Sequence, residues 1–502
     1  MRRREVTTRA GGYPVPIRTA LRLPLISTVV LALGTAVLRL PYLHRPLSPD
    51  EGGFLLLAGQ WSPGSSVYGD YWVDRPPLLI GIFELAGWLG GGAGLRALGM
   101  VAVAVSVVLA GVIGRLAAPG RRWAATLTAA TAAVFLSTPL FGTREVNGEM
   151  LAVPFVLAGL VAVLHAVTTE SRATGWWAGA GILAVCAVAV KQNMADVVVA
   201  GAVALMWQAR ARGLRRTAYD ALAAVAGGVA ALVAFLAWAE ARGTEPRALW
   251  DAAVSFRFEA ASVISTDDPH NTTDRLRGLV RAFRLSGAPL LLLLPLLPFP
   301  RARERGCLPF VAAAVLLWEM VGVAGGGSYW WHYLIGLVPG LVLLVAALAR
   351  HRPGLQVPVV AVLALAVVMA VHTAVFHPGP SREARENEAA GAYLAAHARP
   401  GDTGVVAFGV PSILQRAGLE SPYRYLWSLP VRVRDPELTE LTRVLESRDR
   451  PDWVVVAGDT LETWGVDPAR AQQVLNTRYR ADVTIGRWHL FHVMTGRGTL
   501  SG

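Results

Sequence analysis

The segment Ser48-Pro49-Asp50-Glu51 places two acidic residues directly after the first long apolar stretch of this 502-residue chain. A carboxylate at the edge of a membrane costs free energy unless it has a partner or a function. The same loop continues to Tyr71-Trp72-Val73-Asp74-Arg75-Pro76-Pro77-Leu78, where an acid and a base precede two prolines. These two patterns mark the loop as the first place to look for chemistry.

The composition around this loop is that of a polytopic membrane protein. Mean hydropathy is +0.44 and only 16% of residues are charged, and many apolar runs have the roughly 17 to 22 residues that a membrane-spanning helix needs. The net charge of +12 does not indicate a nucleic-acid partner, because the arginines stand in short clusters between apolar runs. Cys186 and Cys307 lie inside apolar segments, which favours small buried side chains over a disulfide or a zinc site.

Hydropathy predicts about eleven transmembrane helices. Their apolar cores are 24–42, 97–117, 123–139, 150–168, 176–191, 193–209, 218–239, 285–300, 307–324, 332–349 and 356–376. The basic clusters are Arg121–Arg122, Arg172, Arg210–Arg216, Arg301–Arg305 and Arg350–Arg352. All of them fall on the same side as the N-terminus, which predicts a cytoplasmic N-terminus and an outer C-terminus. The first span ends without a small-residue cleavage site, so we expect it to be retained.

One apolar segment, Pro76–Leu89, is too short to cross a membrane. If it did cross, every later arginine cluster would change sides. We therefore predict that it forms an embedded or interfacial helix within the first outer loop.

Composition divides the chain into three parts. We predict a basic cytoplasmic N-terminus over 1–22, a transmembrane domain over 23–376 with its first outer loop at 43–96, and an outer domain over 377–502. In this last part, β-branched runs at 403–410, 453–457 and 488–493 alternate with helical patterns at 382–398, 436–447 and 467–475. The alternation predicts a small α/β domain.

Four groups of polar residues fall at the outer face in this topology. They are Asp50–Glu51 with Asp74–Arg75, the stretch Thr143–Glu149, the tripeptide Lys191-Gln192-Asn193, and the aromatic stretch Ser328–Tyr333. Ionisable groups close to hydrocarbon are costly unless they are partnered. Four such groups on one face therefore predict a shared polar cavity.

Lys191 is the only lysine among the 47 lysine and arginine residues of the chain. A bias that favours arginine everywhere else has left a lysine at this one position. The compact ammonium group suits a phosphate. The alternative is a side chain that reaches from a helix end into the lipid headgroups.

Each of the other groups also has a purely structural interpretation. Asp50 and Glu51 suit the first turn of a helix capped by Ser48, and Arg75 suits an interfacial anchor for the embedded helix. Two further alternatives are ion pairs within a tight loop for Arg144, Glu145 and Glu149, and a place in an interfacial aromatic belt for His332.

The motifs and their order resemble those of the glycosyltransferase C superfamily, and the chain is similar to the protein O-mannosyltransferases and the lipid A aminoarabinose transferases. Those families carry an Asp-Glu pair in the first outer loop, matched by Asp50 and Glu51, and a basic residue before Pro-Pro-Leu, matched by Arg75. They also carry a lysine at the outer end of the fifth span, matched by Lys191, and an aromatic motif ending in proline, matched by Tyr333–Pro339. The resemblance covers residues 20–376.

The chain also departs from these families. The residue at Arg75 is lysine in the aminoarabinose enzymes, and the aspartate of their second outer loop has no direct counterpart, only Glu145 or Glu149. The large inserted outer domain of the mannosyltransferases is missing, so this feature does not favour a protein acceptor.

The resemblance implies transfer of a sugar from a polyprenyl-phosphate donor to an acceptor hydroxyl at the outer face of the cytoplasmic membrane, with inversion at the anomeric carbon. It implies Asp50 as general base and Glu51 as its partner. The donor phosphate would then contact Arg75, Lys191, His332 and Tyr333, and the second-loop group would comprise Arg144, Glu145, Asn147 and Glu149. We predict no cofactor and assign no metal site.

The acceptor is left open among a glycan, a lipid and a protein. Two other functional classes also remain. A flippase for lipid-linked glycans would place its charges near the membrane midplane, and a non-catalytic scaffold would tolerate loss of Asp50.

Overall fold

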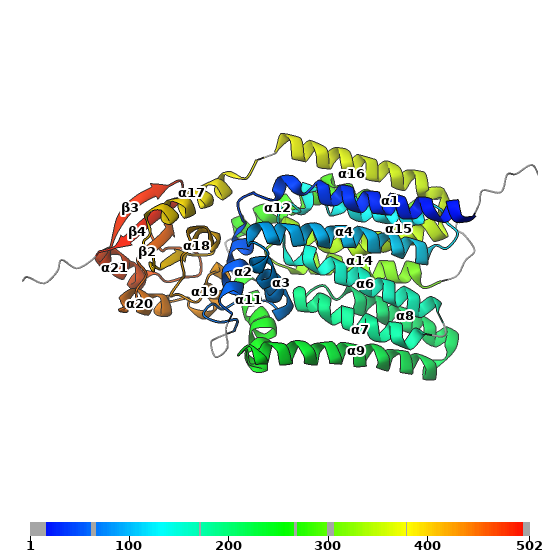
Figure 1. The fold of residues 1–502 in the computed structure, drawn as a ribbon, viewed down its shortest axis with the longest axis horizontal. Coiled ribbons are helices and arrows are strands. Elements are labelled where there is room, and N and C mark those ends of the chain that lie inside the picture. The colour runs from blue at the N-terminus through cyan, green and yellow to red at the C-terminus, as the bar shows by residue number, and fades with distance from the viewer. Residues whose placement is uncertain are drawn as a thin grey trace, which may run out of the picture.

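The long helices of the chain run side by side in one bundle (Figure 1). The computed structural model describes residues 17–61, 67–169, 172–265, 269–298, 306–377 and 379–494. The bundle contains α1 (Ile17–Val37), α4 (Gly92–Ala117), α5 (Ala124–Phe135), α6 (Gly148–Thr168), α7 (Ala173–Val190), α8 (Asp196–Arg212), α9 (Leu214–Ala241), α14 (Leu308–Gly325), α15 (Val338–His351) and α16 (Gln356–Phe376). The predictions for residues 1–16 and for Arg301–Arg305 lie outside the described residues.

Within the described residues, eight helices are long and apolar enough to cross a membrane, or nine if one bent pair counts as a span. The predicted fold class, a polytopic helical membrane protein with a small α/β domain, is confirmed. The predicted number of about eleven spans includes three segments that are short or bent. Two of them are α5, with 12 residues, and α8, with 17.

The third segment corrects the predicted span at 285–300. Here the chain forms α12 (Pro269–Leu285) and α13 (Ala288–Leu293), and a bend of 63° separates the two helical axes. Gly287 at the break has φ +83°, a left-handed conformation that glycine adopts without strain. Pro289, in the first turn of α13, has no N–H to continue the helical hydrogen bonds.

Two short helices lie between α1 and α4, where the sequence predicted a loop with an embedded helix. They are α2 (Pro49–Gly59) and α3 (Pro77–Trp88). With 12 residues, α3 is too short to cross a membrane. Its Leu79, Ile80 and Phe83 are fully buried, so one face of the helix is anchored in the protein.

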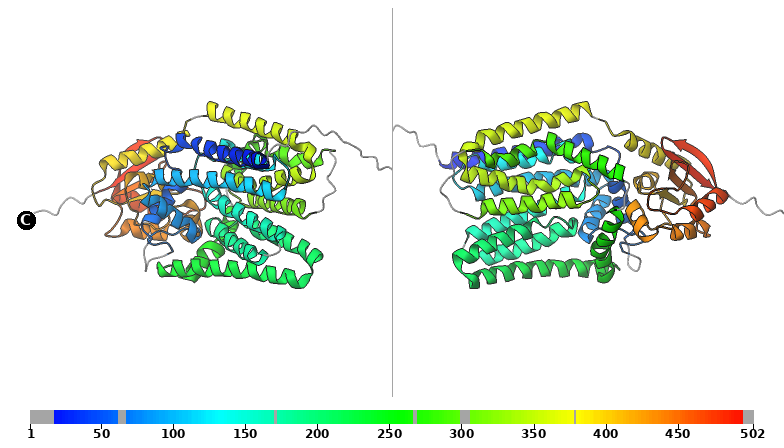
Figure 2. Two further views of the ribbon diagram at one scale, coloured as in Figure 1. Left: turned by 45° about the vertical axis from the view of Figure 1, so that its right-hand side comes forward. Right: turned by 180° about the vertical axis from the view of Figure 1, so that it is seen from behind.

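The C-terminal domain sits at one end of the bundle, which we call the capped end (Figures 1 and 2). The opposite end, which we call the basic end, carries arginines whose side chains bond to backbone carbonyl groups. Arg212 donates to Val167 O at 3.0 Å, Arg350 to Ala117 O at 3.1 Å and Arg352 to Leu297 O at 2.8 Å. These bonds satisfy carbonyl groups at or near helix ends, which have no partner within the helix.

The C-terminal domain is built on a four-stranded sheet. Its elements are α17 (Arg382–His397), β1 (Gly404–Ala407), α18 (Ser412–Ala417), α19 (Ser428–Arg434), α20 (Thr439–Glu446), β2 (Trp453–Ala457), α21 (Ala469–Arg478), β3 (Tyr479–Ile485) and β4 (Trp488–Val493). The strand order is β1-β2-β4-β3. β1 and β2 are parallel, with Val405 opposite Val454, and the other two pairings are antiparallel.

Sequence patterning found three of these strands and missed β3. The segment 479–485 does alternate apolar and polar residues, but it follows a helical pattern directly with no turn residue between them, and most of its side chains are exposed or half-buried. It becomes a strand because the turn at Gly486, with φ +58°, folds it back onto β4. The short helices α18 and α19 were also missed, and both lie where the domain faces the bundle.

Candidate active site

Helix α2 fixes Asp50 and Glu51 in its first turn. The Ser48 hydroxyl accepts a hydrogen bond from Glu51 N at 3.3 Å, and the Glu51 carboxylate accepts one from Ser48 N at 2.9 Å. This reciprocal cap, with Pro49 at the first helical position, explains why the acids stand here and agrees with the helix start considered from the sequence.

Glu51 is fully buried and all of its contacts are within the protein. One carboxylate oxygen pairs with Arg96 Nη2 at 2.8 Å, and the other accepts a hydrogen bond from Val146 N at 2.7 Å. Glu51 thereby ties α2 to α4 and to the loop that leads into α6. This arrangement makes it a residue that supports the site rather than one that faces an open space.

Asp50 is half-buried and is held differently from its neighbour. Its Oδ1 accepts a hydrogen bond from Trp427 Nε1 of the C-terminal domain at 3.0 Å. Among the described residues, Oδ2 has no hydrogen-bond partner. Arg75, Glu145 and His332 all lie within electrostatic range of the carboxylate. One carboxylate oxygen is therefore fixed and the other is available.

A cluster of cations surrounds Asp74, at the other end of the first loop. Arg75 Nη1 lies 2.7 Å from Asp74 Oδ1, and Arg257 Nη2 lies 2.6 Å from Oδ2. Gln192 donates to the Asp74 backbone carbonyl at 2.8 Å. Although burial acts to raise the pKa of Asp74, the two guanidinium groups lower it below its usual value. The ionised acid thus holds two arginines at one place.

Arg257 was not identified from the sequence. It stands in α11 (Phe256–Ser265), a helix in the long connection between α9 and α14, and its side chain is 38% exposed. The one local signal in the sequence is that Arg257 stands between two aromatic residues, Phe256 and Phe258. Only the fold brings it to Asp74, which is 183 residues away.

Lys191 follows the last residue of α7 and turns inward. Its Nζ lies 3.0 Å from Glu149 Oε1 and 5.7 Å from the centre of the Tyr333 ring. Burial lowers the pKa of the Lys191 ammonium, and Glu149 opposes that shift. With 15% of the side chain exposed, Lys191 does not extend into lipid headgroups. In the structure its partner is the carboxylate of Glu149.

The aromatic stretch reaches the same place through η5 (Trp331–Leu337). The turn at Gly142, with φ +66°, packs against it, since an added Cβ there would stand 2.9 Å from His332 N. His332 lies within electrostatic range of both Glu149 and Lys191. The second, third and fourth polar groups are therefore in contact.

Some of the second-loop residues lie in the site, and others make contacts that hold neighbouring segments of the protein together. Arg144 donates to the carbonyl groups of His377 and Thr373, at the end of α16, at 2.5 and 3.4 Å. Asn147 caps α6 by accepting a hydrogen bond from Met150 N at 3.0 Å. Glu145 stays at the exposed rim, while Glu149 joins Lys191. Of the four, Arg144 and Asn147 have structural contacts, and Glu149 lies deepest in the site.

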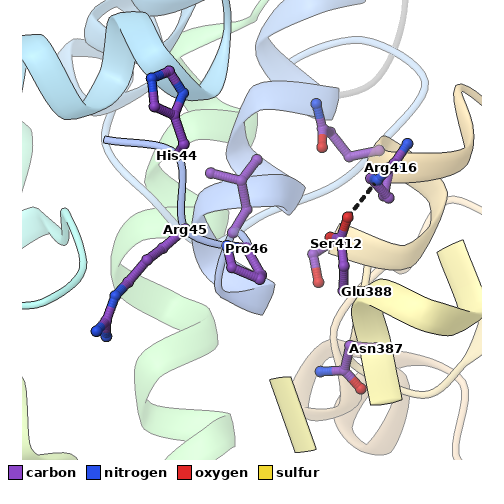
Figure 3. Close-up of a pocket in the computed structure, with 9 residues that line it drawn as sticks. His44, Arg45, Pro46, Asn387, Glu388, Ser412 and Arg416 are labelled. Atoms are coloured by element: carbon purple, nitrogen blue, oxygen red, sulfur yellow. Dashed lines mark hydrogen bonds and ion pairs between the residues drawn. The ribbon is translucent and has the colours of Figure 1, made fainter. Parts of the chain in front are cut away.

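The C-terminal domain also borders residues 44–47, at the start of the first loop. A cavity of about 210 Å³ lies between the first loop and the domain (Figure 3). Its lining consists of His44, Arg45, Pro46, Leu47, Asn387, Glu388, Ser412, Gln415 and Arg416. Arg416 and Glu388, which both lie on the side of the C-terminal domain, form an ion pair with 2.5 Å between Nε and Oε1. Among the described residues, no group of three histidine, cysteine or acidic side chains is placed to hold a metal ion.

Comparison with known proteins gives the superfamily. Residues 74–238, about a third of the chain, match the family model of the dolichyl-phosphate-mannose-protein mannosyltransferases. The crystal structure of ArnT from Cupriavidus metallidurans bound to undecaprenyl phosphate is similar, with a TM-score of 0.61 and 14% identity over 94% of this chain and 98% of that one. The arabinofuranosyltransferase AftD from Mycobacteria has a TM-score of 0.47 and 16% identity over 93% of this chain and 40% of that one. A search of curated proteins found no match.

The likeness to ArnT shows that the chain has the glycosyltransferase C fold. The family match covers the segment that contains both Arg75 and Lys191. The superfamily recognised from the sequence motifs is confirmed, and so is the class of enzyme, a membrane-bound glycosyltransferase.

Proposed function

We propose that the chain transfers a glycosyl group, with inversion, from a polyprenyl-phosphate-linked sugar to an acceptor hydroxyl, and that Asp50 is the general base. The observation that carries this proposal is the convergence of Asp50 with a cationic cluster at the capped end of the bundle. An acid that can accept a proton and cations that can hold a phosphate are the two groups that this reaction requires.

In the reaction, the acceptor hydroxyl hydrogen-bonds to Asp50 Oδ2 and its oxygen attacks the anomeric carbon. The new carbon–oxygen bond forms as the bond between that carbon and the phosphate oxygen breaks, and the hydroxyl proton passes to Asp50. The electron pair of the broken bond leaves with the polyprenyl phosphate. Because the leaving group is already a phosphate, no strong general acid is required.

The cationic cluster suits the leaving group. Arg75, Arg257 and Lys191 are held by the acids Asp74 and Glu149, so three cations face two anions before any ligand binds. The released monoester carries more negative charge than the phosphodiester of the donor. A fixed positive cluster therefore stabilises the transition state more than the bound donor.

The undecaprenyl phosphate bound to ArnT supports a polyprenyl carrier for this chain as well. His332 and Tyr333 remain part of the proposed phosphate site through their proximity to Glu149 and Lys191. Glu145 at the rim remains a candidate for contact with the acceptor.

The orientation that we propose places the capped end outside the cell and the basic end in the cytoplasm. The arginine bonds at the basic end support this orientation, because positive charge is favoured on the cytoplasmic side. Residues 377–502 then form an outer domain, 23–376 the transmembrane domain and 1–22 a cytoplasmic segment. The charges of the site gather at one end of the bundle, which favours a transferase over a flippase.

The test is the Asp50→Asn variant, purified in detergent and checked for an unchanged melting temperature. Donor lipid extracted from the native membrane is the substrate, and release of polyprenyl phosphate is measured. Loss of a general base should reduce turnover by about 100-fold to 10,000-fold. Turnover close to that of the unmodified protein would eliminate Asp50 as the base. Mass spectrometry of envelope glycans from a deletion strain would then identify the sugar and the acceptor.

A further inference from the structure

Two glycines allow the C-terminal domain to touch the helix that carries Asp50. A Cβ added to Gly52 would stand 2.5 Å from the backbone Cα of Ser412, and one added to Gly53 would stand 2.5 Å from Pro411 Cγ and from Trp427 Cζ2. A side chain at either position would push the domain away. Gly59, at the far end of the same helix, has nothing within 4 Å of such an atom.

Trp427 occupies the space that these glycines leave. Its indole N–H donates to Asp50 Oδ1 at 3.0 Å, and its ring lies 5.1 Å from that of Phe54, one turn further along α2. Arg75 is another neighbour of Phe54, with its guanidinium carbon 5.8 Å from the centre of the ring. Trp427 therefore contacts Asp50, the proposed base. It also shares the neighbour Phe54 with Arg75, which belongs to the proposed phosphate site.

The segment around Trp427 is fixed on both sides to connecting segments at the capped end of the bundle. Before it, Ser421 N donates to Tyr71 Oη at 2.9 Å, and Trp72 N donates to Arg424 O at 3.0 Å. After it, Arg434 pairs with Asp251 at 2.9 Å and with Glu259 at 3.3 Å. These contacts set the position of Trp427 relative to α2 without help from Asp50.

We propose that Trp427 is a positioning residue for glycosyl transfer, so that the C-terminal domain supplies part of the active site. The indole holds Oδ1 of Asp50 and thereby directs Oδ2 toward the acceptor hydroxyl. This inference rests on the proposed role of Asp50 as base.

Tryptophan suits this task for two chemical reasons. Its indole nitrogen is a donor only and does not titrate, so it cannot take the proton that Asp50 must accept. A hydrogen bond donated to a carboxylate also favours the ionised form, which is the form able to act as a base. The charged and titratable groups Arg75, Glu145 and His332 act on the same carboxylate, and Trp427 adds a fixed neutral donor.

The experiment compares Trp427→Phe with Trp453→Phe. The first change keeps an aromatic ring beside Phe54 and removes the N–H donor. The second removes a similar bond in the same domain, from Trp453 Nε1 to Asp402 Oδ2 at 3.2 Å, away from the site. Both variants are assayed as full-length protein with donor lipid from the native membrane, over a range of pH, and their melting temperatures are measured.

We expect Trp427→Phe to lower kcat about tenfold or more, the usual effect of a lost hydrogen bond to a charged group, with the KM for the donor almost unchanged. The acid limb of its pH profile should move to higher pH, a shift that a purely structural contact would not produce. Trp453→Phe should match the unmodified enzyme in kcat and in its pH profile.

Two outcomes would overturn the inference. One is a Trp427→Phe enzyme with unchanged kcat and pH profile. The other is an equal loss of kcat and melting temperature in both variants, which would show a packing effect. If Asp50→Asn is inactive while Trp427→Phe is normal, this inference fails and the proposed function stands. If Asp50→Asn is active, it is the proposed function that fails.

Discussion

The two ends of the helical bundle use charge in different ways. At the basic end, Arg212, Arg350 and Arg352 donate to backbone carbonyl groups near helix ends. At the capped end, Arg144 also donates to carbonyl groups, but charged side chains there pair with each other as well, as Glu51 does with Arg96 and Lys191 does with Glu149, and most are buried. Buried ion pairs are costly to assemble and seldom stabilise a protein more than apolar packing would. Their concentration at one end therefore points to function there.

The largest expected effect on stability comes from breaking the pair that joins α2 to α4. Glu51→Ala leaves Arg96, which is 3% exposed, as an uncompensated buried charge. We expect a loss of about 3–5 kcal/mol in the free energy of unfolding, the usual cost of removing one partner of a buried pair. Thermal unfolding in detergent measures the loss.

The matched control at the basic end is Arg212→Ala, which loses a bond to a carbonyl group. It should cost about 1 kcal/mol, in the range of an ordinary hydrogen bond. If Glu51→Ala and Arg212→Ala lost the same free energy of unfolding, the two ends of the bundle would not differ in this way.

A smaller effect, on ligand affinity, is expected at the phosphate site. Lys191→Met keeps the length of the side chain and removes its charge. We expect undecaprenyl phosphate to bind about tenfold to 100-fold more weakly, since a hydrogen bond between charged groups contributes about 1.5–3 kcal/mol. Titration of the purified protein in nanodiscs measures this affinity. Unchanged affinity would mean that Lys191 serves only as the partner of Glu149.

The last comparison concerns two glycines on α2. Gly52→Ala places a methyl group against the backbone of Ser412 and should cost about 1–3 kcal/mol, as overpacking usually does. Gly59→Ala enters open space and should be neutral or slightly stabilising. Melting temperature and the rate of proteolysis between the bundle and the C-terminal domain distinguish the two. If both variants had the same melting temperature and the same rate of proteolysis, the C-terminal domain would not pack against Gly52.

The sequence motifs located most of the site because membrane physics makes polar residues conspicuous. Asp50, Arg75, Lys191 and His332 stand out against apolar runs, and the structure brings Arg75 and His332 within electrostatic range of both Asp50 and Lys191. Arg257 did not stand out, because it lies in a polar connection where arginine is common. The bend at Gly287 was missed because hydropathy averages over a window and does not register a single backbone conformation.

The role of each acid could not be read from its position in the chain. Asp50 and Glu51 are adjacent, but Glu51 faces Arg96 inside the protein while Asp50 faces Trp427. Successive residues of a helix point about 100° apart, so neighbours in sequence meet different surroundings.

By itself the sequence determined the membrane architecture, the short apolar helix in the first loop, the small α/β domain and the polar groups at one face, because hydrophobic length and charge are local properties of the chain. Only the tertiary structure decided which of these charges meet. The contact between Asp50 and Trp427 spans 377 residues, and it depends on two glycines that let one domain approach the backbone of another. The distance between two packed surfaces depends on the whole fold, so hydropathy and charge patterns along the chain do not predict it.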